Sequence, residues 1–147
     1  MPYEYIEDWA PADQAFRAWG NAMEELFRSA VDALLGVMVS DPDLIYPEKK
    51  RNLSLREESP EFLLYQLLRE IIYLKDSEHL LLRIGTDTRD LLIRQEKDGW
   101  FLDCNLLGQN LNAYRGEFLV DVKAVTLHRF SLMKTDRGWE ATVVVDI

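Results

Sequence analysis

The fold is decided first by residues 21–38, which read NAMEELFRSAVDALLGVM. Apolar side chains recur there every three or four residues, the spacing that places them on one face of an α-helix. Asn21 and Glu24 match a capping box at the start, and Ser40-Asp41-Pro42 marks the end. We therefore predict an amphipathic helix that turns the following residues toward a core: Met23, Leu26, Phe27, Ala30, Val31, Leu34, Leu35 and Met38.

A second helix is predicted from Ser59-Pro60, a capping residue followed by proline in the first turn. The pattern stops near Lys75-Asp76-Ser77. Its expected core residues are Phe62, Leu64, Leu67, Leu68, Ile71 and Ile72.

The rest of the chain is predicted to form strands at residues 4–6, 14–19, 52–56, 80–84, 91–95, 100–106, 122–133 and 139–147. Lys97-Asp98-Gly99 and Asp136-Arg137-Gly138 are hairpin signals between neighbouring strands. No internal repeat or flexible linker divides the chain. We expect one domain, residues 1–147, of the α+β class, with two helices packed on one mostly antiparallel sheet.

The composition is acidic, with a formal net charge of −9 over 147 residues. This sign disfavours tight, direct binding to RNA phosphates and favours a basic partner, a cation, or both. The one basic run, Lys49-Lys50-Arg51, is expected to be a solvated loop.

The single cysteine favours a reducing compartment, and the hydropathy pattern gives no sign of a membrane segment. The single cysteine, Cys104, excludes an internal disulfide framework and is expected to be a buried core thiol. The N-terminus lacks a basic stretch followed by an apolar one, and no window reaches the roughly 18 to 20 apolar residues of a membrane span. We expect a cytoplasmic protein that does not enter membranes.

Three segments carry a resemblance to a known family. The opening contains EYIED at 4–8, AD at 12–13, FRAWG at 16–20 and EELF at 24–27. VKAVTLH follows at 122–128, and VVVDI closes the chain at 143–147. In order, spacing and shared termination, these segments resemble those of the archease family, and they run along almost the whole chain.

The resemblance implies an archease-like fold and a role beside another enzyme. Archeases assist an RNA ligase of the tRNA-splicing type that uses GTP and a divalent metal to form a ligase-guanylate and then join RNA ends. The implied partner is that ligase, with RNA met only through it. The implied role is an activator that promotes ligase guanylylation and turnover and is not itself an enzyme.

The resemblance also implies a metal site. Archeases place a metal between groups that match Asp13, Asp146 and the carboxylate of Ile147 in this sequence. The family opening Asp-His-Thr-Ala-Asp corresponds here to Ala10-Pro11-Ala12-Asp13, so the motif His is replaced by Ala10 while the Asp is kept as Asp13. Whatever that His contributes elsewhere cannot be carried over.

The residues themselves are compatible with such a site. Side chains alternate along a strand, so Asp146 projects from the face opposite Val143, Val145 and Ile147. If Asp13 comes alongside, three carboxylates crowd together, and a hard cation with oxygen ligands relieves their repulsion. Ca²⁺ is the first expectation, with Mg²⁺ and Mn²⁺ as alternatives. The alternative without a metal is that Asp13 is a turn aspartate and Asp146 a solvated residue at a strand end.

Lys123 stands in an otherwise apolar, β-branched segment. Lys123 is expected to be a cofactor-binding residue that neutralises the acidic site or reaches a phosphate of the partner, or else an outward-facing strand lysine that discourages edge pairing. His79 and His128 are in no metal-ligand spacing, and Arg83, Arg89 and Arg94 are expected to be charged strand edges.

Two other functions remain open from the sequence. One is a small metal-dependent hydrolase with Asp13 and Asp146 as ligands and a metal-bound water as nucleophile. The other is an interaction module without metal, in which Asp13 and Asp146 lie apart. No Gly-x-Ser-x-Gly elbow, Walker loop or Gly-x-Gly-x-x-Gly motif is present to support nucleophilic catalysis or phosphate cradling.

Overall fold

The computed structural model describes residues 2–7 and 13–147. Two antiparallel sheets hold the strands. The first has the order β1 (Tyr3–Ile6), β2 (Asp13–Gly20), β8 (Gly138–Asp146) and β7 (Ala124–Thr135). The second has the order β3 (Lys49–Glu57), β6 (Gly99–Asn110) and β4 (Leu80–Ile84), and β5 (Leu91–Glu96) also pairs with β6. The helices are α1 (Met23–Met38) and α2 (Pro60–Glu78), with short 3₁₀ turns η1 (Pro42–Leu44), η2 (Thr88–Asp90) and η3 (Leu111–Ala113).

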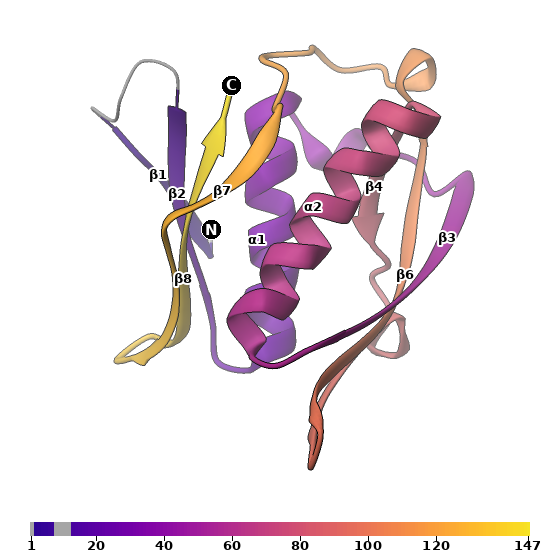
Figure 1. Cartoon of the computed structure of the whole chain (residues 1–147). Helices are drawn as coiled ribbons and strands as arrows, with labels where there is room; N and C mark the ends of the chain where they lie inside the picture. The colour runs from indigo at the N-terminus through magenta and orange to yellow at the C-terminus, as the bar shows by residue number, and fades with distance from the viewer. Residues whose placement is uncertain (1, 8–12) are drawn as a thin grey trace.

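Both helices lie between the two sheets (Figure 1). α1 packs on β1, β2 and β8 of the first sheet and on β4 and β5 of the second, while α2 packs on β7 and on β3, β4 and β6. The α+β class with two helices and antiparallel strands is confirmed, but the expectation of one sheet is wrong. Alternating side chains show that a strand has a buried face without showing which sheet it joins.

One hydrophobic core joins the three layers. It contains Phe16 and Val143 from the first sheet, Leu34 and Leu68 from the helices, and Leu106 from the second sheet, all 0% exposed. α1 is buried on more than one side, which explains why Ser29, Ala33 and Val37 are buried beside its expected apolar face. Helices enclosed by two sheets need this wider buried surface.

The second helix, α2, begins at the predicted residue, and α1 begins one residue later than predicted. Ser59 caps α2 as expected, because its Oγ accepts a hydrogen bond of 3.2 Å from the Phe62 N–H. The capping box predicted for α1 is wrong. Ala22 is the N-cap, so Glu25 occupies the third helical position, and its Oε2 accepts a 3.2 Å hydrogen bond from the Asn21 N–H.

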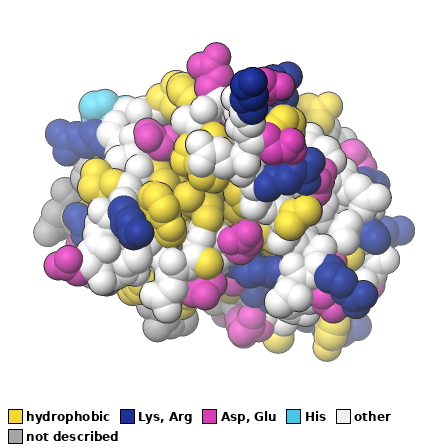
Figure 2. Space-filling model, turned by 90° about the horizontal axis from the view of Figure 1, so that it is seen from below, with side chains coloured by type: hydrophobic (Ala, Val, Ile, Leu, Met, Phe, Trp, Pro, Cys, Tyr) yellow, Lys and Arg dark blue, Asp and Glu magenta, His cyan; other side chains and the backbone are white. Residues whose placement is uncertain are grey.

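Two further expectations are corrected. Phe62 is 45% exposed, whereas its neighbour Leu63 is fully buried. The first turn of α2 is the lower end of that helix in Figure 1, and the view from below shows hydrophobic side chains open to solvent among charged ones (Figure 2). Lys49-Lys50-Arg51 is not a loop, because these residues begin β3 and pair with Leu106–Gly108 of β6.

The two hairpins form where the turn chemistry predicts them. Glu96 pairs with Gly99 around Lys97-Asp98, and Thr135 pairs with Gly138 around Asp136-Arg137. Gly99 has φ +144° and Gly138 has φ +92°, values that favour glycine because a Cβ is strained there. Within the described residues, neither helix is long and apolar enough to cross a bilayer.

Cys104 lies on β6 in the core and is 5% exposed, as predicted. Burial, followed by the charge of Asp103, raises the pKa of its thiol to about 12 from the ordinary 9.0. Since the thiolate is the reactive form, alkylation by iodoacetamide near neutral pH is expected to be roughly a thousandfold slower in the native protein than in urea. Mass spectrometry of the two samples measures this, and rapid native labelling would contradict a buried thiol.

Candidate acidic edge

The first sheet brings the two predicted aspartates to matching positions. β2 and β8 are antiparallel, and their register pairs Asp13 directly with Asp146. Residues opposite one another in an antiparallel pair project from the same face, with Cβ atoms about 4.5–5.5 Å apart. The tertiary structure therefore makes neighbours of two carboxylates that are 133 positions apart in the chain.

This pair projects away from the helices. Along β8, Val143 and Val145 belong to the core that contains α1 and α2, so the alternating positions Val144 and Asp146 lie on the face away from the helices. On β2, Phe16 is in the same core, and Asp13 shares the opposite face with Ala15. Both aspartates are partly exposed. A cation or a partner can reach these two carboxylates without displacing a helix, whereas Ala15 and Val144 on the same face are buried.

A third chain segment meets the same edge. Ala124 of β7 pairs with Asp146, and the Lys123 N–H donates a 2.8 Å hydrogen bond to the Asp146 carbonyl. The C-terminus and the beginning of β7 lie together at the top of Figure 1. We call Asp13, Asp146 and Ile147 the acidic edge.

Lys123 itself is directed elsewhere. Its exposed side chain lines a groove between α2 and β7, together with Tyr65, Arg69 and Tyr73 of the helix. Since Val125, two residues on, is buried in the core beside the helices, alternation places Lys123 on the helix side of the sheet and Asp146 on the outer side. The lysine therefore borders the acidic edge through its backbone.

The donor set of the acidic edge suits a hard cation, since carboxylate oxygens are the ligands that Ca²⁺ and Mg²⁺ prefer. Asp13 and Asp146 supply a pair. Among residues 2–7 and 13–147, no three or more His, Cys, Asp or Glu side chains are grouped so that they could hold a metal ion. Ala10, which replaces the family His, lies outside the described residues.

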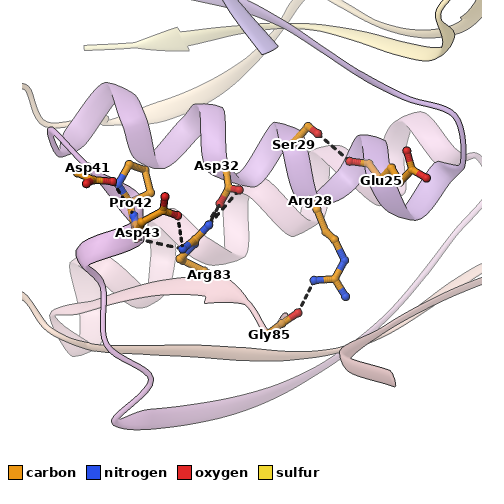
Figure 3. Close-up of polar contacts among 9 residues, drawn as sticks. All are labelled: Glu25, Arg28, Ser29, Asp32, Asp41, Pro42, Asp43, Arg83 and Gly85. Carbon is orange, nitrogen blue, oxygen red and sulfur yellow. Dashed lines mark hydrogen bonds and ion pairs between the residues drawn. The ribbon is translucent and has the colours of Figure 1, made fainter. Parts of the chain in front are cut away.

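A second polar cluster is structural. Arg83 of β4 reaches Asp32 of α1 through two nitrogens, with Nη2 3.0 and 3.1 Å from the carboxylate oxygens and Nε 3.1 Å from Oδ1 (Figure 3). It also donates to Asp43 Oδ1 at 3.0 Å. Burial raises the pKa of Asp32, and the Arg83 charge opposes that rise. Arg28 donates to the Gly85 carbonyl (Figure 3). These charges satisfy one another and join α1 to the second sheet.

The remaining candidates have local roles. Arg89 pairs with Asp87 at 3.1 Å, and Arg94 pairs with Glu96 and Asp103. His79 ends α2 in the left-handed conformation at φ 58°, and its carbonyl accepts a hydrogen bond from Leu111. His128 is exposed on β7.

A family model described as the archease protein family (MTH1598/TM1083) matches residues 3–147. The chain belongs to the archease family. It is 34% identical over 148 residues to a protein archease of Archaeoglobus fulgidus, covering all of both chains. It is 32% identical over 145 residues to that of Methanosarcina barkeri, covering 99% of this chain and 95% of the relative.

Solved archease structures have the same fold. The solution structure of Methanobacterium thermoautotrophicum protein 1598 superposes with a TM-score of 0.82 at 28% identity, covering 99% of each chain. A crystal structure from Thermotoga maritima, titled as an archease and possible chaperone, superposes with a TM-score of 0.63 over 94% of this chain and 93% of that one. At 20% identity the latter supports the fold alone. The archease resemblance of the three sequence segments is thus confirmed.

Proposed function

We propose that this archease-family chain is a cytoplasmic accessory protein that activates a GTP- and metal-dependent RNA ligase of the tRNA-splicing type. The observation that carries the proposal is the register that sets Asp13 opposite Asp146 on the outer face of the first sheet. Two carboxylates beside a chain end give an acidic edge that can enter the mouth of a basic, phosphate-binding enzyme. Family membership supports the class of partner.

In this proposal Asp13, Asp146 and the carboxylate of Ile147 hold one divalent cation, with Ca²⁺ the first expectation. Bound there, the cation supplies positive charge that offsets carboxylate repulsion and attracts phosphate oxygens. Lys123 adds a second positive charge toward the nucleotide phosphates from the opposite, helix-facing side of the sheet. The chain promotes guanylylation of the ligase and leaves the joining of RNA to the ligase.

The test is a multiple-turnover ligation assay with the ligase, GTP, a divalent metal and RNA ends. Added at a small molar ratio to the ligase, the chain is expected to raise both the rate of ligase-guanylate formation and the number of turnovers. Alone it is expected neither to join RNA nor to hydrolyse GTP. GTP hydrolysis by the isolated chain that disappears on substitution of Asp13 and Asp146 would favour a hydrolase, and unchanged ligation would contradict activation.

A further inference from the structure

The groove between α2 and β7 combines cationic and aromatic side chains. Its volume is about 370 Å³, within the range of about 300–1,000 Å³ that is typical of small-molecule sites. On the helix, Tyr65, Arg69 and Tyr73 are spaced four residues apart, so they share one stripe. The start of β7 supplies Lys123 on the other side.

Neither cationic side chain of this groove, Arg69 or Lys123, forms an ion pair with a carboxylate of the described residues. Arg69 Nη1 donates to the neutral Gln66 Oε1 at 3.4 Å, and its guanidinium lies 5.5 Å from the centre of the Tyr65 ring. Six other arginines of the described residues do form ion pairs with carboxylates: Arg17, Arg51, Arg83, Arg89, Arg94 and Arg137.

The one carboxylate that lines the groove, Asp76, shares its counter-ion with a second carboxylate. Asp76 Oδ1 lies 2.5 Å from Lys75 Nζ, and the same ammonium is 2.6 Å from Asp121 Oδ1. Burial opposes the charge of Lys75, but its hydrogen bonds with Asp121 and Asp76 hold its pKa above the ordinary value. Lys75 therefore offsets only part of the Asp76 charge, and the Lys75, Asp76 and Asp121 group keeps one negative charge against the two positive charges of Arg69 and Lys123.

The tyrosines give the groove a second kind of contact. Tyr73 is 60% exposed, although a large aromatic side chain on a helix is usually turned inward. The Tyr65 ring is fixed edge-on against Phe130, with ring centroids 5.7 Å apart. A nucleobase can stack on an exposed ring, and such stacking is worth about 1–3 kcal/mol per base.

From this geometry we propose that the α2–β7 groove binds one nucleotide unit, with its phosphate between Arg69 and Lys123 and its base against Tyr73. The unit belongs either to a free nucleotide or to a single-stranded RNA end. The inference departs from the expectation that RNA is met only through the ligase. It does not rest on ligase activation, because binding is measured on the isolated chain.

The test is fluorescence anisotropy of a fluorescein-labelled ten-nucleotide single-stranded RNA, with unlabelled GMP and inorganic phosphate as competitors. A salt series is recorded from an ionic strength of about 0.02 M, where attraction between the groove cations and phosphate is screened least, to about 0.15 M. Binding is expected to weaken steadily with salt. GMP that competes with the RNA shows that the groove takes the nucleotide unit from either source. GMP that binds in a calorimetric titration while the RNA gives no anisotropy change assigns the free nucleotide.

Arg69→Gln/Lys123→Gln is expected to weaken binding about tenfold or more, because two charge-assisted contacts to phosphate are lost. The matched control is Lys49→Gln/Lys50→Gln, which changes the net charge equally at two exposed positions of β3. Tyr73→Ala is expected to weaken binding severalfold, and Tyr73→Phe to retain it. Melting temperatures of all variants should match wild type, since these side chains are exposed.

Three outcomes would overturn the assignment. Equal loss in both charge-matched double variants would mean non-specific attraction to the whole surface. Inorganic phosphate that competes as well as GMP would remove the base from the site. Failure of the RNA, GMP and phosphate all to bind at low salt would leave the groove without this ligand.

Discussion

Asp13→Ala and Asp146→Ala are each expected to abolish stimulation of the ligase while the chain stays folded. Loss of an outer-shell partner of a metal already costs about 10–100-fold in metal affinity, and loss of a carboxylate ligand costs at least as much. Because the register pairs these residues, either substitution disables the same site. The measurement is the guanylylation rate of the ligase at a fixed ratio of variant to ligase.

The matched control is Asp136→Ala, which removes an exposed carboxylate from the turn at the other end of the β7–β8 hairpin. It should stimulate like wild type. All three variants should lose less than about 0.5 kcal/mol of stability without metal, because they alter partly exposed positions. Added Ca²⁺ should raise the melting temperature of wild type and Asp136→Ala only. Full stimulation by the Asp13 and Asp146 variants would separate the acidic edge from activation.

Leu34→Ala and Leu68→Ala are each expected to lower the free energy of unfolding by about 2–5 kcal/mol. Both side chains are fully buried, Leu34 on α1 and Leu68 on α2, in the core between the sheets. Truncation there leaves a cavity that two sheets and a second helix prevent from collapsing. Urea unfolding followed by circular dichroism measures the loss.

Phe62→Ala is the control for the core prediction, because it truncates a large apolar side chain of the same helix that is 45% exposed. A loss of about 1 kcal/mol or less is expected, since much of the Phe62 side chain already contacts water. Similar losses for Phe62→Ala and Leu68→Ala would contradict a core confined between the sheets.

Features governed by neighbouring residues could be predicted from the sequence. Ser59 caps α2 because its hydroxyl needs only the N–H of Phe62, three residues away. Gly99 and Gly138 close their hairpins because positive φ excludes most other residues there. Helix periodicity identified Leu34 and Leu68 as core residues, and the family segments identified Asp13 and Asp146 as site candidates. The N-cap of α1 was predicted one residue too early, because the capping-box pattern accepts either Glu24 or Glu25 as the third helical residue.

Features that depend on distant pairing were decided by the tertiary structure. Alternation along β8 indicated the face of Asp146, but only the antiparallel register of β2 with β8 made Asp13 its neighbour. The division of the strands into two sheets has the same origin, because a strand pattern does not specify its partners. The groove of Arg69, Tyr73 and Lys123 could not be predicted from the sequence. The four-residue spacing of Tyr65, Arg69 and Tyr73 was visible, but the other wall, which begins at Lys123, is about 50 residues away in the sequence. Local hydrogen bonds and torsions are encoded within a few residues, whereas a shared face between β7 and α2 exists only after the core has formed.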